Sequence, residues 1–99
     1  MTTPTFIPGP WRRVGHRTIA AGSGLASRRI CELYSWGDCT EADGNEALIA
    51  AAPELYQVAH DAEAMLTRQK WRPDPSSPEG ALLVALRSVL AKVSNGGAS

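Results

Sequence analysis

Long apolar stretches are scarce in this sequence. The longest runs cover residues 47–53 and 81–86, and both fall far short of the roughly 20 apolar residues that a helix needs to span a bilayer. Residues 1–10 also lack the basic start and the continuous apolar stretch that mark a secretion signal. We therefore expect a cytoplasmic protein with no membrane partner.

Cysteine and histidine are also sparse, with two residues of each type. Cys31 and Cys39 are spaced neither as a redox pair nor as paired zinc ligands, and without an export signal we expect reduced thiols. His16 and His60 occur singly rather than as a local pair of ligands. We expect no metal site and no cofactor.

Charges of one sign are missing from two long stretches. Residues 1–31 contain five arginines and no acid, whereas residues 32–63 contain eight acids and no lysine or arginine. The net charge is nevertheless zero. An acid-free group of arginines raises the local potential and can form an anion-binding face, but charge runs are more often solvated or neutralise each other. We favour the second interpretation and keep the anion-binding face as the alternative.

The pattern along the chain predicts an α+β fold, in which a short antiparallel hairpin or three-stranded sheet is followed by two amphipathic helices. At 99 residues the chain has room for one domain, which we place at 11–94. An extended segment, 1–10, with three prolines should precede it, and a disordered tail, 95–99, should follow. The sheet should cover about 11–36, because short segments with β-forming side chains flank a glycine-containing reversal at 22–24.

Helical patterns occupy the rest of the domain, at about 45–70 and 78–94. Asn45 is a candidate N-cap for the first helix, which should bend or restart at Pro53. Beyond that proline, apolar residues recur at the three-and-four spacing of a single stripe. Ser77, followed by proline and glutamate, predicts the start of the last helix, whose leucines and valines repeat at the same spacing.

Three segments resemble small phage and prophage proteins of unknown function. The pattern of these proteins starts with TPGPW, continues through a short β-hairpin to a central NARLIAAAPELLEAL, and ends in a helix with A-I-A-K-A. The corresponding segments here are PGPWR at 8–12, NEALIAAAPELY at 45–56 and LAKV at 90–93. The sequence departs from that pattern at Ile7, Glu46, Ala47 and Tyr56. The resemblance covers most of the chain and implies a phage setting, and hence a bacterial host cytoplasm, without implying an activity.

Catalytic motifs are missing from the chain, which carries no Gly-x-Ser-x-Gly, no HExxH and no P-loop. The neighbouring residues His60 and Asp61 would point about 100° apart on a helix, so they do not form an oriented acid–base pair. Extended nucleic acid is not expected as a partner, because a neutral chain with an acidic middle third repels a long phosphate backbone. We therefore expect a non-enzymatic binding protein.

A compact anion needs less positive surface than a nucleic acid, and about two to four arginines with an aromatic plane suffice. We expect this phage accessory protein to bind and sequester a small nucleotide-type signal of host immunity. The expected ligand contacts are arginines and tryptophans of the predicted sheet: Trp11, Arg12, Arg13, Arg28, Arg29 and Trp36. We also expect a homo-oligomer, because an open sheet edge with exposed aromatic residues calls for a partner surface.

Three alternatives stay open from the sequence. The arginines could pair with acids of the same or a neighbouring subunit, and the candidates are Glu32, Glu41, Glu46 and Glu54. The acidic helical face could instead cover a host defence protein, because acidic surfaces can mimic nucleic acid. The chain could also be a structural or regulatory phage protein without a ligand.

Overall fold

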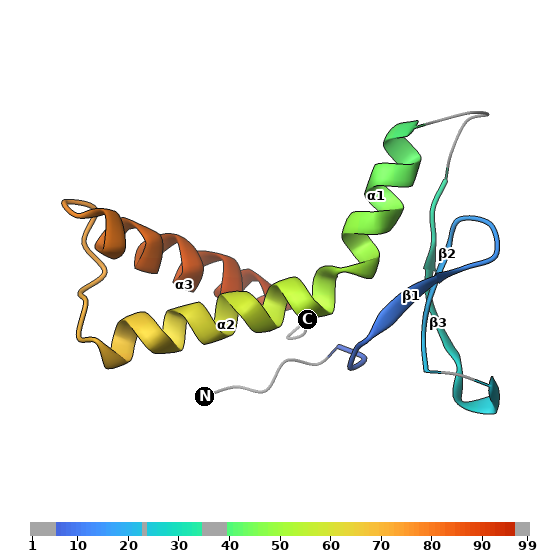
Figure 1. Ribbon diagram of the computed structural model, residues 1–99, viewed down its shortest axis with the longest axis horizontal. Helices are drawn as coiled ribbons and strands as arrows, with labels where there is room; N and C mark the ends of the chain where they lie inside the picture. The colour runs from blue at the N-terminus through green and yellow to red at the C-terminus, as the bar shows by residue number, and fades with distance from the viewer. Residues whose placement is uncertain (1–5, 23, 35–39, 97–99) are drawn as a thin grey trace. The chain divides into compact units, whose positions relative to one another are not determined.

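The computed structural model describes residues 6–22, 24–34 and 40–96. A three-stranded antiparallel sheet is followed by helices, which confirms the predicted α+β architecture (Figure 1). The strands are β1 (Trp11–Val14), β2 (Thr18–Ala21) and β3 (Arg28–Glu32), with a 3-10 helix at Gly24–Ala26 before β3. The helices are α1 (Thr40–Ala50), α2 (Ala52–Arg68) and α3 (Pro78–Gly96).

Two tight connections shape the sheet, in which β2 is the central strand. The turn between β1 and β2 ends at Arg17, whose backbone is left-handed with φ at 55°. Gly22 follows β2 with φ at 77°, and a Cβ at this position would lie 2.6 Å from the carbonyl oxygen of Ala26. Glycine is therefore required where the 3-10 helix folds back on the end of β2.

The pairing of β2 with β3 contains a β-bulge. The register shifts by one residue after Ile19, because Ile30 of β3 has no residue opposite it. Arg28 rather than Arg29 consequently stands opposite Ala21 at the end of β2. The bulge thus decides which of two adjacent arginines lies at this end of the sheet.

The helical region starts earlier than the sequence predicts and contains three helices rather than two. α1 begins at Thr40, so Asn45 lies inside the helix and is not its N-cap. The first turn contains Glu41 and Asp43, which suit the positive end of the helix dipole. The restart expected at Pro53 is present, because α1 ends and α2 begins just before this proline.

Contacts within the chain separate it into two compact units, one formed by Ile7–Leu55 and the other by Phe6 with residues 56–96. In the first unit, α1 packs against β1 and β2. Its buried apolar side chains are small ones and one isoleucine: Ile19, Ala20, Ala21 and Ala42. In the second unit, α2 and α3 form an antiparallel hairpin whose buried leucines are Leu66 and Leu83 (Figure 1). The single domain expected over 11–94 stays a prediction.

The start of α3 follows from local chemistry, whereas its end lies beyond the predicted one. Ser77 caps the helix as predicted, because its hydroxyl accepts a hydrogen bond from the backbone N–H of Gly80 at 3.0 Å. Position 80 has no room for a side chain, since a Cβ there would lie 2.1 Å from the carbonyl oxygen of Asp74. α3 continues to Gly96, two residues beyond its predicted end and into the predicted tail. The rest of that tail, 97–99, lies outside the described residues.

Candidate functional site

Charged side chains connect the first hairpin of the sheet to α1. Glu46 of α1 is only 4% exposed, and both of its carboxylate oxygens accept hydrogen bonds. Arg13 donates from Nε to Oε1 at 2.9 Å, and Arg17 donates from Nη1 to Oε2 at 2.7 Å. Arg17 also donates to the exposed carboxylate of Asp43. The buried carboxylate is therefore matched by two guanidinium groups, as the burial of a charge requires.

These hydrogen bonds shift the protonation equilibria of the network. Arg13 and then Arg17 hold the pKa of Glu46 below its ordinary value of 4.5, because both donors stabilise the carboxylate form. Asp43 and then Glu46 raise the pKa of Arg17 by accepting its hydrogen bonds. Glu46 and Arg17 are therefore ionised at neutral pH, and their hydrogen bonds hold α1 against the sheet.

The arginines predicted as ligand contacts fall into two sets. Arg13 is occupied by Glu46, and Arg29 pairs with Glu32 on the exposed surface at 3.4 Å. Arg12 and Arg28 have no carboxylate partner among the described residues. The pairing alternative is thus observed for two of the four candidate arginines, and the other two are left without a neutralising acid in the part of the chain that the structure describes.

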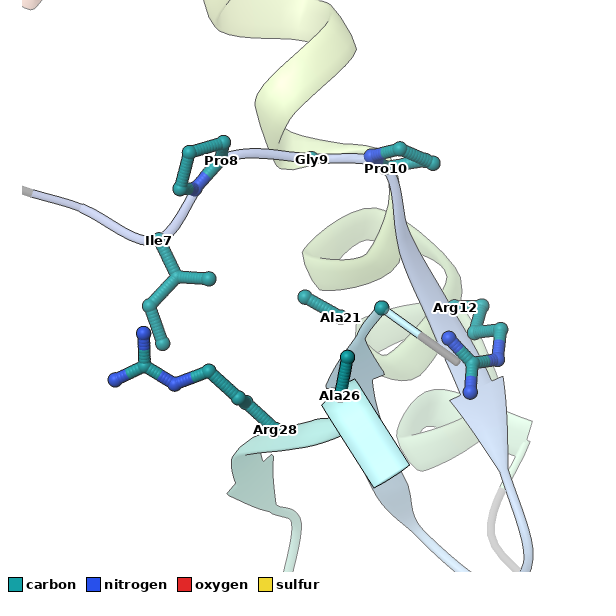
Figure 2. A pocket seen from close by; sticks show the side chains of 9 residues that line it. Ile7, Pro8, Gly9, Pro10, Arg12, Ala21, Ala26 and Arg28 are labelled. Carbon is teal, nitrogen blue, oxygen red and sulfur yellow. The ribbon is translucent and has the colours of Figure 1, made fainter. Parts of the chain in front are cut away.

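Arg12 and Arg28 line one open hollow of about 570 Å³ at the end of the sheet (Figure 2). The lining comes from the segment before β1, from all three strands and from the connection between β2 and β3: Ile7, Pro8, Gly9, Pro10, Arg12, Ala21, Gly22, Ala26 and Arg28. Figure 2 shows Arg28 extending toward Ile7, while Arg12 lies beyond Ala21 and Ala26. The volume lies within the range of about 300–1,000 Å³ of small-molecule sites. Both charged residues of this described lining are cations.

The two predicted tryptophans are placed differently. Trp11 donates its indole Nε1–H to the carbonyl oxygen of Ile7 at 2.9 Å and is not among the lining residues. Trp36 lies outside the described residues. The apolar part of the wall is formed instead by Ile7, Pro8 and Pro10. The structure therefore places the arginines of the two outer strands at one hollow, on either side of Ala21 and Ala26, without the stacking plane expected from Trp11.

The wall formed by residues 8–10 is the part of the site that sequence reasoning misses. A Cβ on Gly9 would lie 2.6 Å from Cβ of Pro53, so this segment lies directly against the start of α2. The Gly9–Pro10 peptide bond is cis. The signal in the sequence is the pair of prolines around one glycine just before Trp11, because prolines restrict the backbone and the indole anchors it.

A protein-family model described as Salmonella phage P22 protein Y8K6 matches residues 1–98 of the chain. The chain belongs to this family. This Y8K6 family member is thus a phage accessory protein, as the resemblance of its sequence implies, and the family description states no activity. Neither a curated protein nor a solved structure gave a significant match.

Metal ligands, membrane-spanning helices and thiols are other features through which the Y8K6 family member could act. Its described residues contain no group of three or more His, Cys, Asp or Glu side chains placed to hold a metal ion. Among the described helices, none combines the length and the apolar character needed to cross a membrane. Cys31 is a free, half-buried thiol in β3, and Cys39 lies outside the described residues.

A second hollow, of about 270 Å³, lies along the α2–α3 hairpin of the Y8K6 family member. Its lining residues are Tyr56, His60, Glu63, Arg87, Leu90, Ala91 and Ser94. Arg87 donates to Glu63 at 3.1 Å and to the hydroxyl of Thr67 at 3.2 Å. Since its arginine is already neutralised, this hollow is a poorer anion site than the one at the end of the sheet.

Proposed function

We propose that this phage protein binds a small anionic ligand of nucleotide type in the hollow at the end of the sheet, and thereby sequesters a signal of host immunity. The proposal rests on the difference between arginines that form ion pairs and arginines that line the hollow. Arg13, Arg17 and Arg29 are occupied by intramolecular ion pairs. Arg12 and Arg28 line the hollow with no acid beside them in the described part of the chain. Phosphate oxygens accept charge-assisted, often bidentate hydrogen bonds from such guanidinium groups.

The placement of the two guanidinium groups favours a ligand with more than one phosphate. Arg12 belongs to β1 and Arg28 to β3, and the end of β2 at Ala21 lies between them. A ligand that uses both arginines must present acceptors on two sides, as a linear or cyclic dinucleotide does. The wall at Ile7 and Pro8 offers apolar contact for a base or a sugar.

Membership of a phage family supports the biological part of the proposal. Host immune signals are present in the infected cell at the same time as phage proteins, and a protein that removes such a signal needs affinity and abundance rather than a catalytic group. One ligand held per subunit would then deplete the signal in proportion to the amount of phage protein.

Isothermal calorimetry with mono-, di- and cyclic nucleotides tests the proposal. We expect saturable binding by the unaltered protein and roughly tenfold or greater weakening in Arg12→Ala and in Arg28→Ala, because each variant loses a charge-assisted hydrogen bond. Both side chains are exposed, so the melting temperature should not change. Arg29→Ala is the matched control, since Arg29 is an exposed arginine of the same strand that does not line the hollow.

Two results would reject this proposal. The first is an absence of binding by the unaltered protein across all these nucleotides and across signals extracted from phage-infected cells. The second is an equal loss of binding in Arg29→Ala, which would indicate a diffuse charge effect. In either case an inhibitor that covers a host defence protein with its acidic helical face becomes the leading alternative, ahead of a protein without a ligand.

A further inference from the structure

The α2–α3 hairpin leaves large apolar side chains uncovered. On α2, Val58 is 67% exposed and Met65 is 46% exposed. On α3, Leu82 is 50%, Val89 is 52% and Val93 is 36% exposed. Surface helices normally turn such a stripe toward a core, and exposed apolar patches of this kind mark contact surfaces.

Helical periodicity places the stripe of α2 on one side of the hairpin. Glu63 faces α3, since its carboxylate accepts a hydrogen bond from Arg87. At about 100° per residue, Val58 and Met65 lie roughly 140–160° around α2 from Glu63. The buried Leu66 lies on the part of the helix surface between Glu63 and the stripe of Val58 and Met65.

The stripe of α3 follows the same order. Leu83 is fully buried and lies between Arg87 on one side and the exposed Leu82 and Val89 on the other. On each helix the polar contact, the buried leucine and the exposed stripe follow one another in the same rotational direction about the helix axis. Because α3 runs antiparallel to α2, this order puts the two exposed stripes on the same side of the hairpin. The polar hollow around Glu63 and Arg87 is then on the opposite side.

We propose that a second copy of this chain covers the apolar face, so that two α2–α3 hairpins form a four-helix bundle in a homodimer. The unit that contains the hairpin covers Phe6 and residues 56–96 of the described chain, which is little more than the roughly 40 residues below which oligomerisation or another staple is usually needed. The 19 residues of α3 extend about 28 Å. Two helices side by side therefore present a projected face of roughly 500 Å², and its corrugated surface approaches the ~800 Å² that each partner contributes to a standard interface.

Charges at the rim of the face suit a second copy. Asp61 borders the stripe of α2, and Lys92 borders the stripe of α3. The hydrogen bond between Glu63 and Arg87 fixes the axial register of α2 against α3. Asp61 and Lys92 therefore lie at nearly the same position along the hairpin axis. A two-fold axis parallel to the helices sets α2 against the α3 of the other copy, which brings Asp61 beside the partner's Lys92 twice in the dimer.

Sedimentation equilibrium of the full chain at micromolar concentration tests the dimer. We expect a dimer mass for the unaltered protein and a monomer mass for Val89→Glu, because the variant places an unpaired charge in the interface. Val84→Glu should stay dimeric. It is the matched control, since Val84 is also an exposed valine of α3, at 42%, but lies about 140° around the helix from Val89.

A second variant on the other helix, Val58→Glu, extends the test, and circular dichroism at the same concentrations distinguishes dissociation from unfolding. If Val89→Glu fails to fold, the milder Val89→Thr should still weaken the dimer, so that it dissociates at a higher protein concentration than the unaltered protein does. A monomeric unaltered protein overturns the proposal, and so does a dimer that persists in both glutamate variants. The test is independent of ligand binding, because neither arginine of the hollow is changed.

Discussion

The two compact units of this protein are stabilised by different interactions. In the unit Ile7–Leu55, four small or medium apolar side chains are buried, and a charged network around Glu46 holds α1 against the sheet. In the α2–α3 hairpin, the buried side chains are leucines, and none of its described charged residues is buried. The first unit therefore depends on protonation state, and the second depends on packing volume.

This difference follows from the amount of apolar surface that each unit can bury. Alanines on β2 remove little area from water, so the buried ion pairs contribute the specificity with which α1 is placed. A fully buried leucine contributes roughly 1.5–3 kcal/mol, and Leu83 needs no polar partner. The hairpin also has more apolar residues than two helices can cover.

The largest expected effect is on the hairpin. Leu83→Ala removes a side chain with no exposed surface and leaves a cavity, so the free energy of unfolding should fall by about 2–5 kcal/mol. Denaturant unfolding measures the loss, and hydrogen exchange should locate it in α3. Val84→Ala, at an exposed position of the same helix, should stay within about 0.5 kcal/mol of the unaltered protein. Equal losses in the two variants would contradict a core at Leu83.

The next effect is on the sheet unit. Glu46→Gln leaves Arg13 and Arg17 without their buried carboxylate, and the melting temperature should fall on the order of 10 °C. Amide protection in β2 should fall with it. Glu41→Gln changes an exposed glutamate of the same helix and serves as the control. Unchanged protection of β2 in Glu46→Gln would show that the network does not hold α1 in place.

Acid should destabilise the sheet unit more than the hairpin. Because Arg13 and Arg17 hold the pKa of Glu46 below 4.5, the unfolded chain takes up this proton at a higher pH than the folded chain does. The stability from the network is complete above about pH 4.5 and is lost as the pH falls through the lower, folded-state pKa. The difference in melting temperature between the unaltered protein and Glu46→Gln should therefore shrink in acid. A difference that is constant with pH would refute this assignment.

The smallest effect concerns the cap of α3. Ser77→Ala removes the acceptor for the N–H of Gly80 and should cost about 1 kcal/mol of unfolding free energy in urea titrations. Ser76→Ala, one position earlier in the same loop, should change stability by less than about half as much. If both substitutions have the same effect, the hydroxyl of Ser77 is not a cap.

Local signals account for the parts of the fold that could be predicted. The strands follow from β-forming residues around a glycine turn, and α3 follows from Ser77 and its neighbours. The start of α1 could not be predicted, because Gly44 and Asn45 have low helix propensity. The helix there also includes Glu46, whose partners Arg13 and Arg17 lie 33 and 29 residues away in the sequence.

The candidate site was predictable only in part. Alternation along a strand indicates that one arginine of each adjacent pair can serve a given pocket, and Arg12 and Arg28 line the hollow while Arg13 and Arg29 pair with acids. The choice within each pair depends on tertiary structure. Glu46 of α1 selects Arg13, and the bulge in β3 sets Arg28 opposite the end of β2.

Because of the bulge, β3 has one residue more than β2 between the pairs Arg28–Ala21 and Cys31–Ile19. One residue could be deleted between Arg28 and Cys31 while Arg28 stays opposite Ala21 and Cys31 stays opposite Ile19, now in a regular ladder. An insertion cannot be accommodated in this way, because it needs a second bulge or pushes Arg28 past the end of β2. Relatives that bind the same ligand should therefore tolerate a β3 that is shorter by one residue more readily than one that is longer.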